Sequence, residues 1–111
     1  MIKSDTERII KIIKLCEALK KQIANHNITK DSLLNYEFSQ WAVTTPLYNI
    51  GEQTYKISKE TKDKYPDIPW SVVSGLRHRL VHDYEGINWT IIVEVVFEEM
   101  NEFIESIKAI I

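Results

Sequence analysis

The sequence predicts an all-α protein, an up-and-down bundle of four helices. Apolar residues recur at intervals of three and four along most of the chain, which is the spacing of one helix face. Only three glycines and three prolines interrupt 111 residues, and this favours long helices over a turn-rich β architecture. The length fits one domain that spans residues 1–111.

The first helix is predicted to open at Ser4–Glu7, whose Ser-Asp-Thr-Glu sequence has the pattern of a capping box. Polar turn formers at Asn25–Asn27 predict its end. Between them, lysines alternate with an apolar face made of Ile9, Ile12, Ile13, Cys16, Leu19 and Ile23.

The second helix is expected from about Asp31 to about Ser58. Pro46 lies inside it and should kink or split it, because proline lacks the amide hydrogen and clashes with the preceding turn. We therefore expect a disturbance between Thr44 and Pro46, and Gly51 should loosen the helix further.

The charged segment Lys59–Asp67 is predicted to be a loop with room for one short helical turn. Pro69 suits the first position of the third helix, where a missing amide hydrogen costs nothing. This helix should run from Trp70 to Val81 or His82 and bury Val72, Val73, Leu76 and Leu80.

The fourth helix should begin after Asn88, a residue type favoured at helix N-caps. Its apolar stripe is wider than one neighbouring helix pair requires. Two interpretations stay open: a deeply buried bundle helix, or a second contact surface for a dimer. The stripe comprises Trp89, Ile91, Ile92, Val93, Val95, Val96, Phe97, Met100, Phe103, Ile107 and Ile110.

The net charge of −2 excludes a general basic coat for nucleic acid. Residues 1–64 carry eleven Lys and Arg against eight Asp and Glu, whereas residues 65–111 carry three against eight. The one dense basic cluster in the second half lies at 77–82, so an RNA site would have to be local.

No window is apolar for the length of a membrane span, and residues 1–5 lack the apolar run of a signal peptide. The single cysteine, Cys16, cannot form an internal disulfide. These features suit a reducing compartment. We expect a cytoplasmic protein without a membrane partner.

The segment Gly75–Tyr84 combines residue types that can process a phosphodiester. Arg77 offers a planar fork of donors for phosphate, and His82 can move protons near neutral pH. Arg77 and His82 lie about 140° apart on an ideal helix. They can cooperate only if the helix ends near His82 or if two copies face each other across a dimer axis. No metal is needed, because imidazole supplies the acid–base step and arginine stabilises the developing charge.

Two alternatives to this site stay open. His78 and His82 have the spacing of two zinc ligands on one helix face, but Arg79 stands where metalloproteases have glutamate, and flanking arginines disfavour a dication. The arginines could instead be surface residues that favour the helix C-terminus, with His82 as a satisfied polar group in the interior and Tyr84 as a core or boundary aromatic.

The chain resembles the HepT-like toxins of the HEPN superfamily. The motif is Arg, a polar residue, three further residues, His, any residue and Tyr, and Arg77, His78, His82 and Tyr84 fill it. The family order also includes Ile50–Glu52, Tyr65–Trp70, and Ile87–Asn88 leading into the last helix. The match covers residues 40–100 well and the first helix only in character.

The resemblance implies a homodimeric, metal-independent ribonuclease that acts as the toxin of a type VII toxin–antitoxin pair and needs no cofactor. Arg77 and His82 would be catalytic, with His78 assisting. The cognate antitoxin would be a minimal nucleotidyltransferase that transfers AMP to Tyr84. A bulky anionic nucleotide there would occupy the place of the substrate phosphate beside Arg77.

Glu52 could support Arg77 through a salt bridge, or it could be an ordinary surface glutamate. A further function also stays open: a non-catalytic helical partner, or nucleotide-binding subunit, of a nucleotidyltransferase. A plain structural dimer with a vestigial motif is the third possibility.

Overall fold

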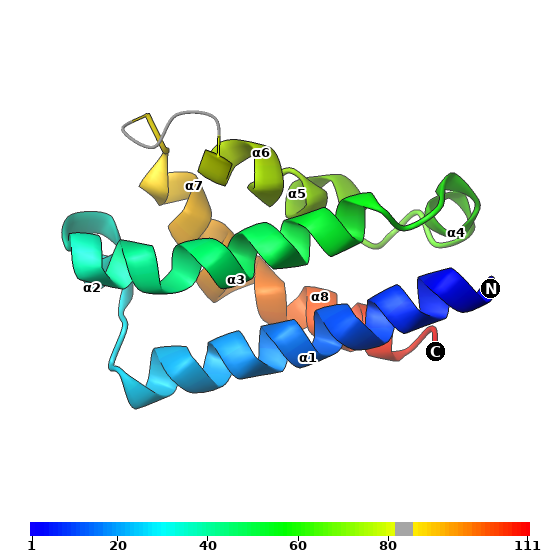
Figure 1. Cartoon of the computed structure of the whole chain (residues 1–111), viewed down its shortest axis with the longest axis horizontal. Coiled ribbons are helices and arrows are strands. Elements are labelled where there is room, and N and C mark those ends of the chain that lie inside the picture. Colours follow the sequence, from blue (N-terminus) through cyan, green and yellow to red (C-terminus); the bar gives the residue numbers. More distant parts are fainter. Residues whose placement is uncertain (82–85) are drawn as a thin grey trace.

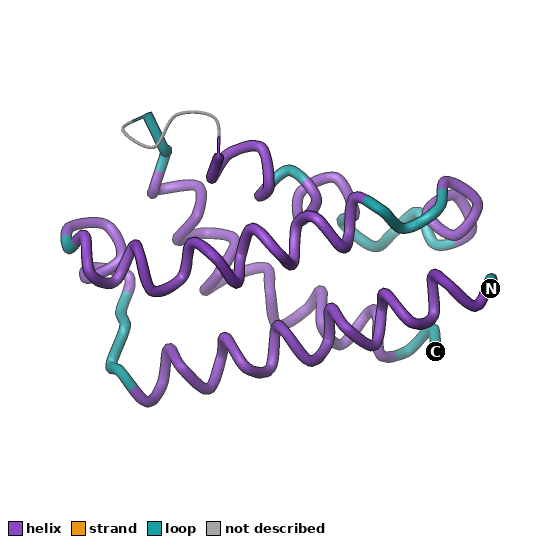
Figure 2. Tube along the Cα trace, viewed as in Figure 1, coloured by secondary structure: helices purple, strands orange, loops and turns teal. Residues whose placement is uncertain are grey.

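The computed structural model describes residues 1–81 and 86–111, and all regular structure in these two ranges is helical (Figures 1 and 2). Figure 2 shows short connections between the helices and no strand in the described residues. The all-α prediction is therefore confirmed. The elements are α1 (Lys3–Asn25), α2 (Lys30–Asn35), α3 (Glu37–Tyr55), α4 (Lys59–Lys64), α5 (Trp70–Ser74), α6 (Leu76–Val81), α7 (Trp89–Glu94), the π-helical turn η1 (Val95–Glu99) and α8 (Met100–Lys108).

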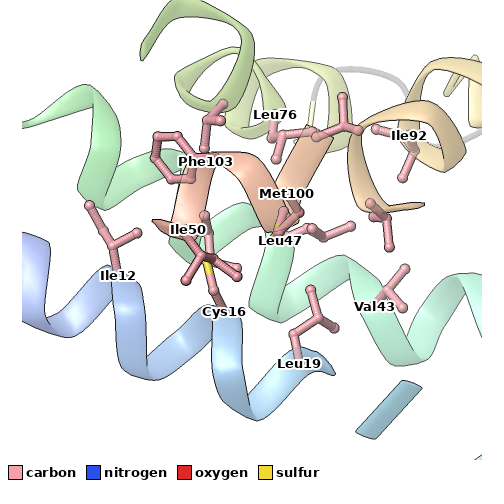
Figure 3. Close-up of a cluster of buried hydrophobic side chains, with 14 of the residues drawn as sticks. Ile12, Cys16, Leu19, Val43, Leu47, Ile50, Leu76, Ile92, Met100 and Phe103 are labelled. Atoms are coloured by element: carbon pink, nitrogen blue, oxygen red, sulfur yellow. The ribbon is translucent and has the colours of Figure 1, made fainter. Parts of the chain in front are cut away.

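The core lies where α1 and α3 pack side by side and are covered by α5, α6 and the α7–α8 segment (Figure 1). Figure 3 shows side chains from these helices meeting in one cluster, with Ile12, Leu47 and Phe103 fully buried. Phe103 also meets the ring of Trp70 edge to face, with 6.2 Å between the ring centroids. One continuous core thus fixes α3 against the helix that carries Arg77.

The N-terminus of α1 differs from the predicted capping box. The helix begins at Lys3, and its N-cap residue Ile2 makes no side-chain cap. The buried Asp5 instead contacts the N-terminus of α4, where its carboxylate accepts hydrogen bonds from the Ser58 amide, the Ser58 hydroxyl and the Thr61 hydroxyl at 3.0, 2.5 and 2.6 Å. The capping-box prediction was wrong because the helix begins before Ser4, so Ser4 lies inside its first turn, and Glu7 lies 4.0 Å from Nζ of Lys3 instead. The predicted end is confirmed at Asn25, and Asn27 follows with a φ of 52°.

The break in the predicted second helix falls at Tyr36 and not at Pro46. Tyr36 is extended, with φ −121° and ψ 119°, and separates α2 from α3. The side-chain amide of Gln40 donates hydrogen bonds from Nε2 to the carbonyls of Leu33 and Leu34, which satisfies acceptors that the end of α2 leaves free. Helix α3 continues through Pro46, so the predicted split near Thr44–Pro46 was wrong. Packing against α1 outweighs the one lost hydrogen bond.

The segment expected to be a loop with one helical turn contains the short helix α4, whose N-cap is Ser58. The predicted third helix is divided at Gly75 into α5 and α6. Pro69 was predicted at the first helical position, but it is the N-cap residue, and the helix begins at Trp70. The predicted burial holds for Val73, Leu76 and Leu80, but Val72 is 40% exposed. Its position on α5 faces away from the core.

The predicted N-cap Asn88 is confirmed, since its side chain accepts a hydrogen bond from the Ile91 amide. The wide apolar stripe that follows has a structural cause. The π-helical turn η1 holds more residues per turn than an α-helix, and this brings both Val95 and Val96 onto the buried side. Most of the stripe is buried within one chain, which supports the interpretation as a bundle helix. No helix in the described ranges is long and apolar enough to cross a membrane.

Candidate active site around Arg77

The backbone of α6 approaches α3 closely at Gly51. A Cβ atom added to Gly51 would lie 2.7 Å from the backbone nitrogen of Arg77 and 3.2 Å from both the Leu76 Cβ and the Val73 carbonyl oxygen. No side chain fits at such distances, so glycine is required for this contact between helices. The prediction that Gly51 loosens the helix missed this role: Gly51 sets the position of Arg77.

Two side chains of α3 hold the guanidinium of Arg77. Its Nη1 lies 3.6 Å from Oε2 of Glu52, and its Cζ lies 3.7 Å from the centroid of the Tyr55 ring. Glu52 and Tyr55 are three residues apart, so one helix turn places them on the same face of α3. The Arg77 side chain is 34% exposed, which leaves part of the guanidinium open to a ligand.

Glu52 occupies the position expected of a support for Arg77. Its Oε2 is buried and accepts no hydrogen bond from the described residues, so the Arg77 charge is its nearest compensation there. Its other oxygen, Oε1, lies 3.8 Å from Nζ of Lys56. The carboxylate is therefore shared by two cations and partly neutralises them.

A third cation, Lys62, lies near the ring of Tyr55. Nζ of Lys62, from α4, is 5.8 Å from the Tyr55 ring centroid and donates a hydrogen bond of 3.1 Å to the Tyr55 carbonyl oxygen. That carbonyl belongs to the last residue of α3, where the helix dipole is negative. The charge of Lys62 offsets the negative C-terminal end of α3 and adds positive charge beside Tyr55 and Arg77.

The other motif residues of α6 have different surroundings. His78 and Arg79 are both exposed. Arg79 is turned by about 200° from Arg77 around an ideal helix. It lines a cavity of about 230 Å³ together with Val72, Glu94 and Glu99. The structure therefore separates the two arginines, and Arg77 alone of the pair contacts Glu52 and Tyr55.

His82 and Tyr84 lie outside the described residues. Their predicted convergence with Arg77, the predicted alignment of Tyr84 with Arg77, and the His78–His82 pair of the zinc alternative stay predictions. Among the described residues, no group of three or more His, Cys, Asp or Glu is arranged to hold a metal ion. Burial, followed by the charge of Glu17, raises the pKa of the Cys16 thiol to about 12, so this cysteine is no nucleophile near neutral pH.

Sequence reasoning missed Gly51 and Tyr55 as parts of the site. Tyr55 stands one helix turn after Glu52, so the same spacing that makes Glu52 a candidate partner of Arg77 also reaches Tyr55. The role of Gly51 depends on which helix crosses α3, and a single sequence does not contain that information. Two larger cavities, of about 420 and 280 Å³, are lined by residues from α1, the α1–α2 connection, α3, η1 and α8, and these include none of the residues around Arg77.

Several known proteins similar to the chain are named as ribonucleases. The chain is 32% identical over 103 residues to a protein of Caldanaerobacter subterraneus subsp. tengcongensis named as a putative RNase, covering 90% of this chain and 88% of the relative. It is 35% identical over 86 residues to a protein of Methanocaldococcus jannaschii that is also named as a putative RNase, covering 78% and 71%. A protein of Thermococcus cleftensis, named probable ribonuclease HepT, is 30% identical over 102 residues, covering 92% and 84%.

No solved structure matches the chain significantly. The model of the family described as ribonuclease HepT-like matches residues 3–110, which is nearly the whole chain. The match includes α3, which carries Glu52 and Tyr55, and α6, which carries Arg77. The chain therefore belongs to the ribonuclease HepT-like family.

Proposed function

We propose that the chain is a metal-independent endoribonuclease, and that it is the toxin of a type VII toxin–antitoxin system. The observation that carries the proposal is the Arg77 guanidinium, partly exposed and fixed by Glu52 and Tyr55 in a chain of this family. A fixed cation suits transition-state stabilisation, because no reorganisation is needed as charge develops on a phosphate.

The proposed chemistry uses the ribose 2′-hydroxyl as the nucleophile. Its oxygen forms a bond to phosphorus while the bond to the 5′-oxygen breaks, and the 5′-oxygen leaves with a proton. His82 serves this step by accepting the 2′-hydroxyl proton or by donating a proton to the leaving oxygen. His78 assists, and Arg77 stabilises the charge on the pentavalent phosphorus. Glu52 holds the guanidinium in place through its carboxylate.

We expect the active form to be a homodimer, and one face of α3 supports this. Phe38, Trp41, Thr45 and Tyr48 follow one another at spacings of three and four, the pattern of a seam between packed helices. Phe38 is 77% exposed and Trp41 is 55% exposed in the single chain. The same row of α3 continues to Glu52 and Tyr55, so a second copy packed on this seam would lie beside Arg77.

A charge on the seam should therefore separate the copies. Trp41→Glu is expected to give a monomer in sedimentation velocity, with much slower RNA cleavage. Ile10→Glu changes an apolar residue of α1 that is 41% exposed outside the seam, and it should leave the dimer intact. Equal sedimentation of wild type and Trp41→Glu would place the dimer contact elsewhere.

The proposed inhibitor is a minimal nucleotidyltransferase antitoxin that forms an ester between the Tyr84 oxygen and the phosphorus of AMP, releasing pyrophosphate from ATP. An AMP phosphate near Arg77 would compete with RNA for the same cation. Intact-protein mass after co-expression with the nucleotidyltransferase should increase by one or more AMP units. Tyr84→Phe should show no increase and should remain toxic. An unchanged wild-type mass with an active partner would contradict this mode of control.

Cleavage by variants tests the ribonuclease proposal. Arg77→Ala and His82→Ala should each cut RNA at least about a hundredfold more slowly than wild type, the usual cost of removing one charge-stabilising or proton-transferring group. Arg79→Ala removes an equal charge from the other side of α6 and should retain cleavage within a few-fold. Full activity of folded Arg77→Ala would refute the site. A wild-type chain that binds the nucleotidyltransferase but never cuts RNA would favour the alternative of a non-catalytic partner.

A further inference from the structure

The ring of Tyr55 has a position that the contact with Arg77 alone does not explain. Tyr55 is 54% exposed as the last residue of α3, and it lies next to a guanidinium that is itself partly open. A large aromatic surface in water beside cations is a common feature of sites that bind nucleotides, because a base can stack on the ring while its phosphates meet the charges.

The charges around Tyr55 complement a nucleotide chain. Arg77 stacks at 3.7 Å, Lys62 lies 5.8 Å from the ring centroid, and Lys56 follows Tyr55 directly in sequence. Two acidic groups oppose these charges: Glu52, whose carboxylate is already shared between Arg77 and Lys56, and Asp5, whose charge acts on Lys62 while its carboxylate accepts hydrogen bonds from Ser58 and Thr61. Residues 86–111 of the α7–α8 side, in contrast, carry five glutamates and one lysine. Of these two surfaces, the one at Tyr55 attracts a polyanion.

The distance between Tyr55 and Arg77 links this surface to the cleavage step. The guanidinium is in direct contact with the ring, so a phosphate bound to Arg77 brings its attached nucleoside within reach of Tyr55. The part of the ring that Arg77 leaves exposed can then accept an unpaired base. A base-paired nucleotide could not stack there, because its faces are covered by its neighbours in the duplex.

We propose that Tyr55 is a base-stacking residue for the nucleotide adjacent to the scissile phosphate, with Lys56 and Lys62 contacting the neighbouring phosphates. This proposal rests on the proposed ribonuclease function and adds a binding subsite to it. Tyr55 also positions Arg77, so the test must separate stacking on a base from effects on the phosphate contact.

The experiment measures binding of two single-stranded 2′-O-methyl oligonucleotides, which cannot be cut because the nucleophilic hydroxyl is blocked. One carries a base at every position, and the other has an abasic site at the position under test, scanned along the strand. Fluorescence anisotropy gives the Kd of wild type, Tyr55→Ala and Tyr55→Phe. Tyr36→Ala is the matched control, because Tyr36 is 60% exposed and precedes the opposite end of α3.

Wild type should bind the complete strand about tenfold more tightly than the strand abasic at the stacking position, the usual effect of one stacked base. Tyr55→Ala should remove this difference, and Tyr55→Phe and Tyr36→Ala should keep it. An equal loss for both strands in Tyr55→Ala would show that Tyr55 acts only through Arg77, and no loss would also overturn the proposal. If wild type shows the expected binding pattern but never cuts unmodified RNA, the ribonuclease proposal fails and the base subsite stands.

Discussion

Replacing Gly51 with alanine is expected to destabilise the protein and to remove most RNA cleavage. The new Cβ would lie 2.7 Å from the Arg77 backbone nitrogen, and a backbone atom cannot move aside as a flexible side chain can. Helix α6 must therefore shift away from α3, at a cost of about 1–3 kcal/mol for overpacking. Alanine favours the helix by about 1 kcal/mol over glycine, which offsets part of this cost. The shift also moves Arg77 away from Glu52 and Tyr55.

Urea unfolding and cleavage rates, measured on the same preparations, test this expectation. Gly75→Ala is the matched control, since its Cβ would meet only the Ser71 carbonyl at 3.0 Å and the Val72 carbonyl at 3.5 Å, both in α5, the helix that Gly75 ends. This control should lose less stability and retain cleavage. A Gly51→Ala protein as stable and as active as wild type would show that the close approach of α3 and α6 is not needed.

Replacing Asp5 with alanine should cost about 3 kcal/mol of the free energy of unfolding. Asp5 is 1% exposed, and its carboxylate accepts hydrogen bonds from the Ser58 amide and hydroxyl and from the Thr61 hydroxyl. Hydrogen bonds to a charged group are worth about 1.5–3 kcal/mol each, and the truncation leaves their donors unsatisfied. Asp31→Ala, at an exposed aspartate in the first turn of α2, should have a small effect in the same urea titration.

The Asp5 contribution should also depend on pH. Burial acts to raise the pKa of Asp5, but the hydrogen bonds from Ser58 and Thr61, with the charge of Arg8, outweigh it and hold the pKa below its ordinary value of 3.8. The folded state therefore binds this proton less readily than the unfolded chain. The stabilisation is fully present above pH 3.8 and is lost as the pH falls through the lower, folded-state pKa. In Asp5→Asn, stability should fall less steeply below pH 4; an unchanged acid slope would contradict this role.

Patterns that depend on local spacing predicted much of the fold. The apolar face of the first helix, its end at Asn25, and the Asn88 N-cap all follow from neighbours within one or two turns. A salt bridge between Arg77 and Glu52 was one of the two interpretations of Glu52 that the sequence left open, and the two charges do lie 3.6 Å apart. The resemblance to the family drew attention to both residues, and the structure decides between the two interpretations of Glu52.

The errors have a common physical cause in tertiary contacts. Asp5 accepts hydrogen bonds at the N-terminus of α4 because Ser58 lies next to it in space, although Ser58 is 53 residues away in sequence. Pro46 is tolerated within α3, and the chain breaks instead at Tyr36, where Gln40 can satisfy the free carbonyls. Glycine lowers helix stability, so the sequence alone predicts that Gly51 loosens its helix; its packing role follows only from the position of α6. None of these outcomes could be read from local spacing alone.

The central claim is that the site around Arg77 cuts RNA through the ribose 2′-hydroxyl. The most direct test is to incubate the purified chain, free of its partner, with RNA in excess EDTA and to identify the ends of the products. We expect cleavage to persist, with 2′,3′-cyclic phosphate or 3′-phosphate ends, and to disappear in Arg77→Ala. Cleavage that requires a divalent cation, or products with 3′-hydroxyl ends, would contradict the proposed mechanism.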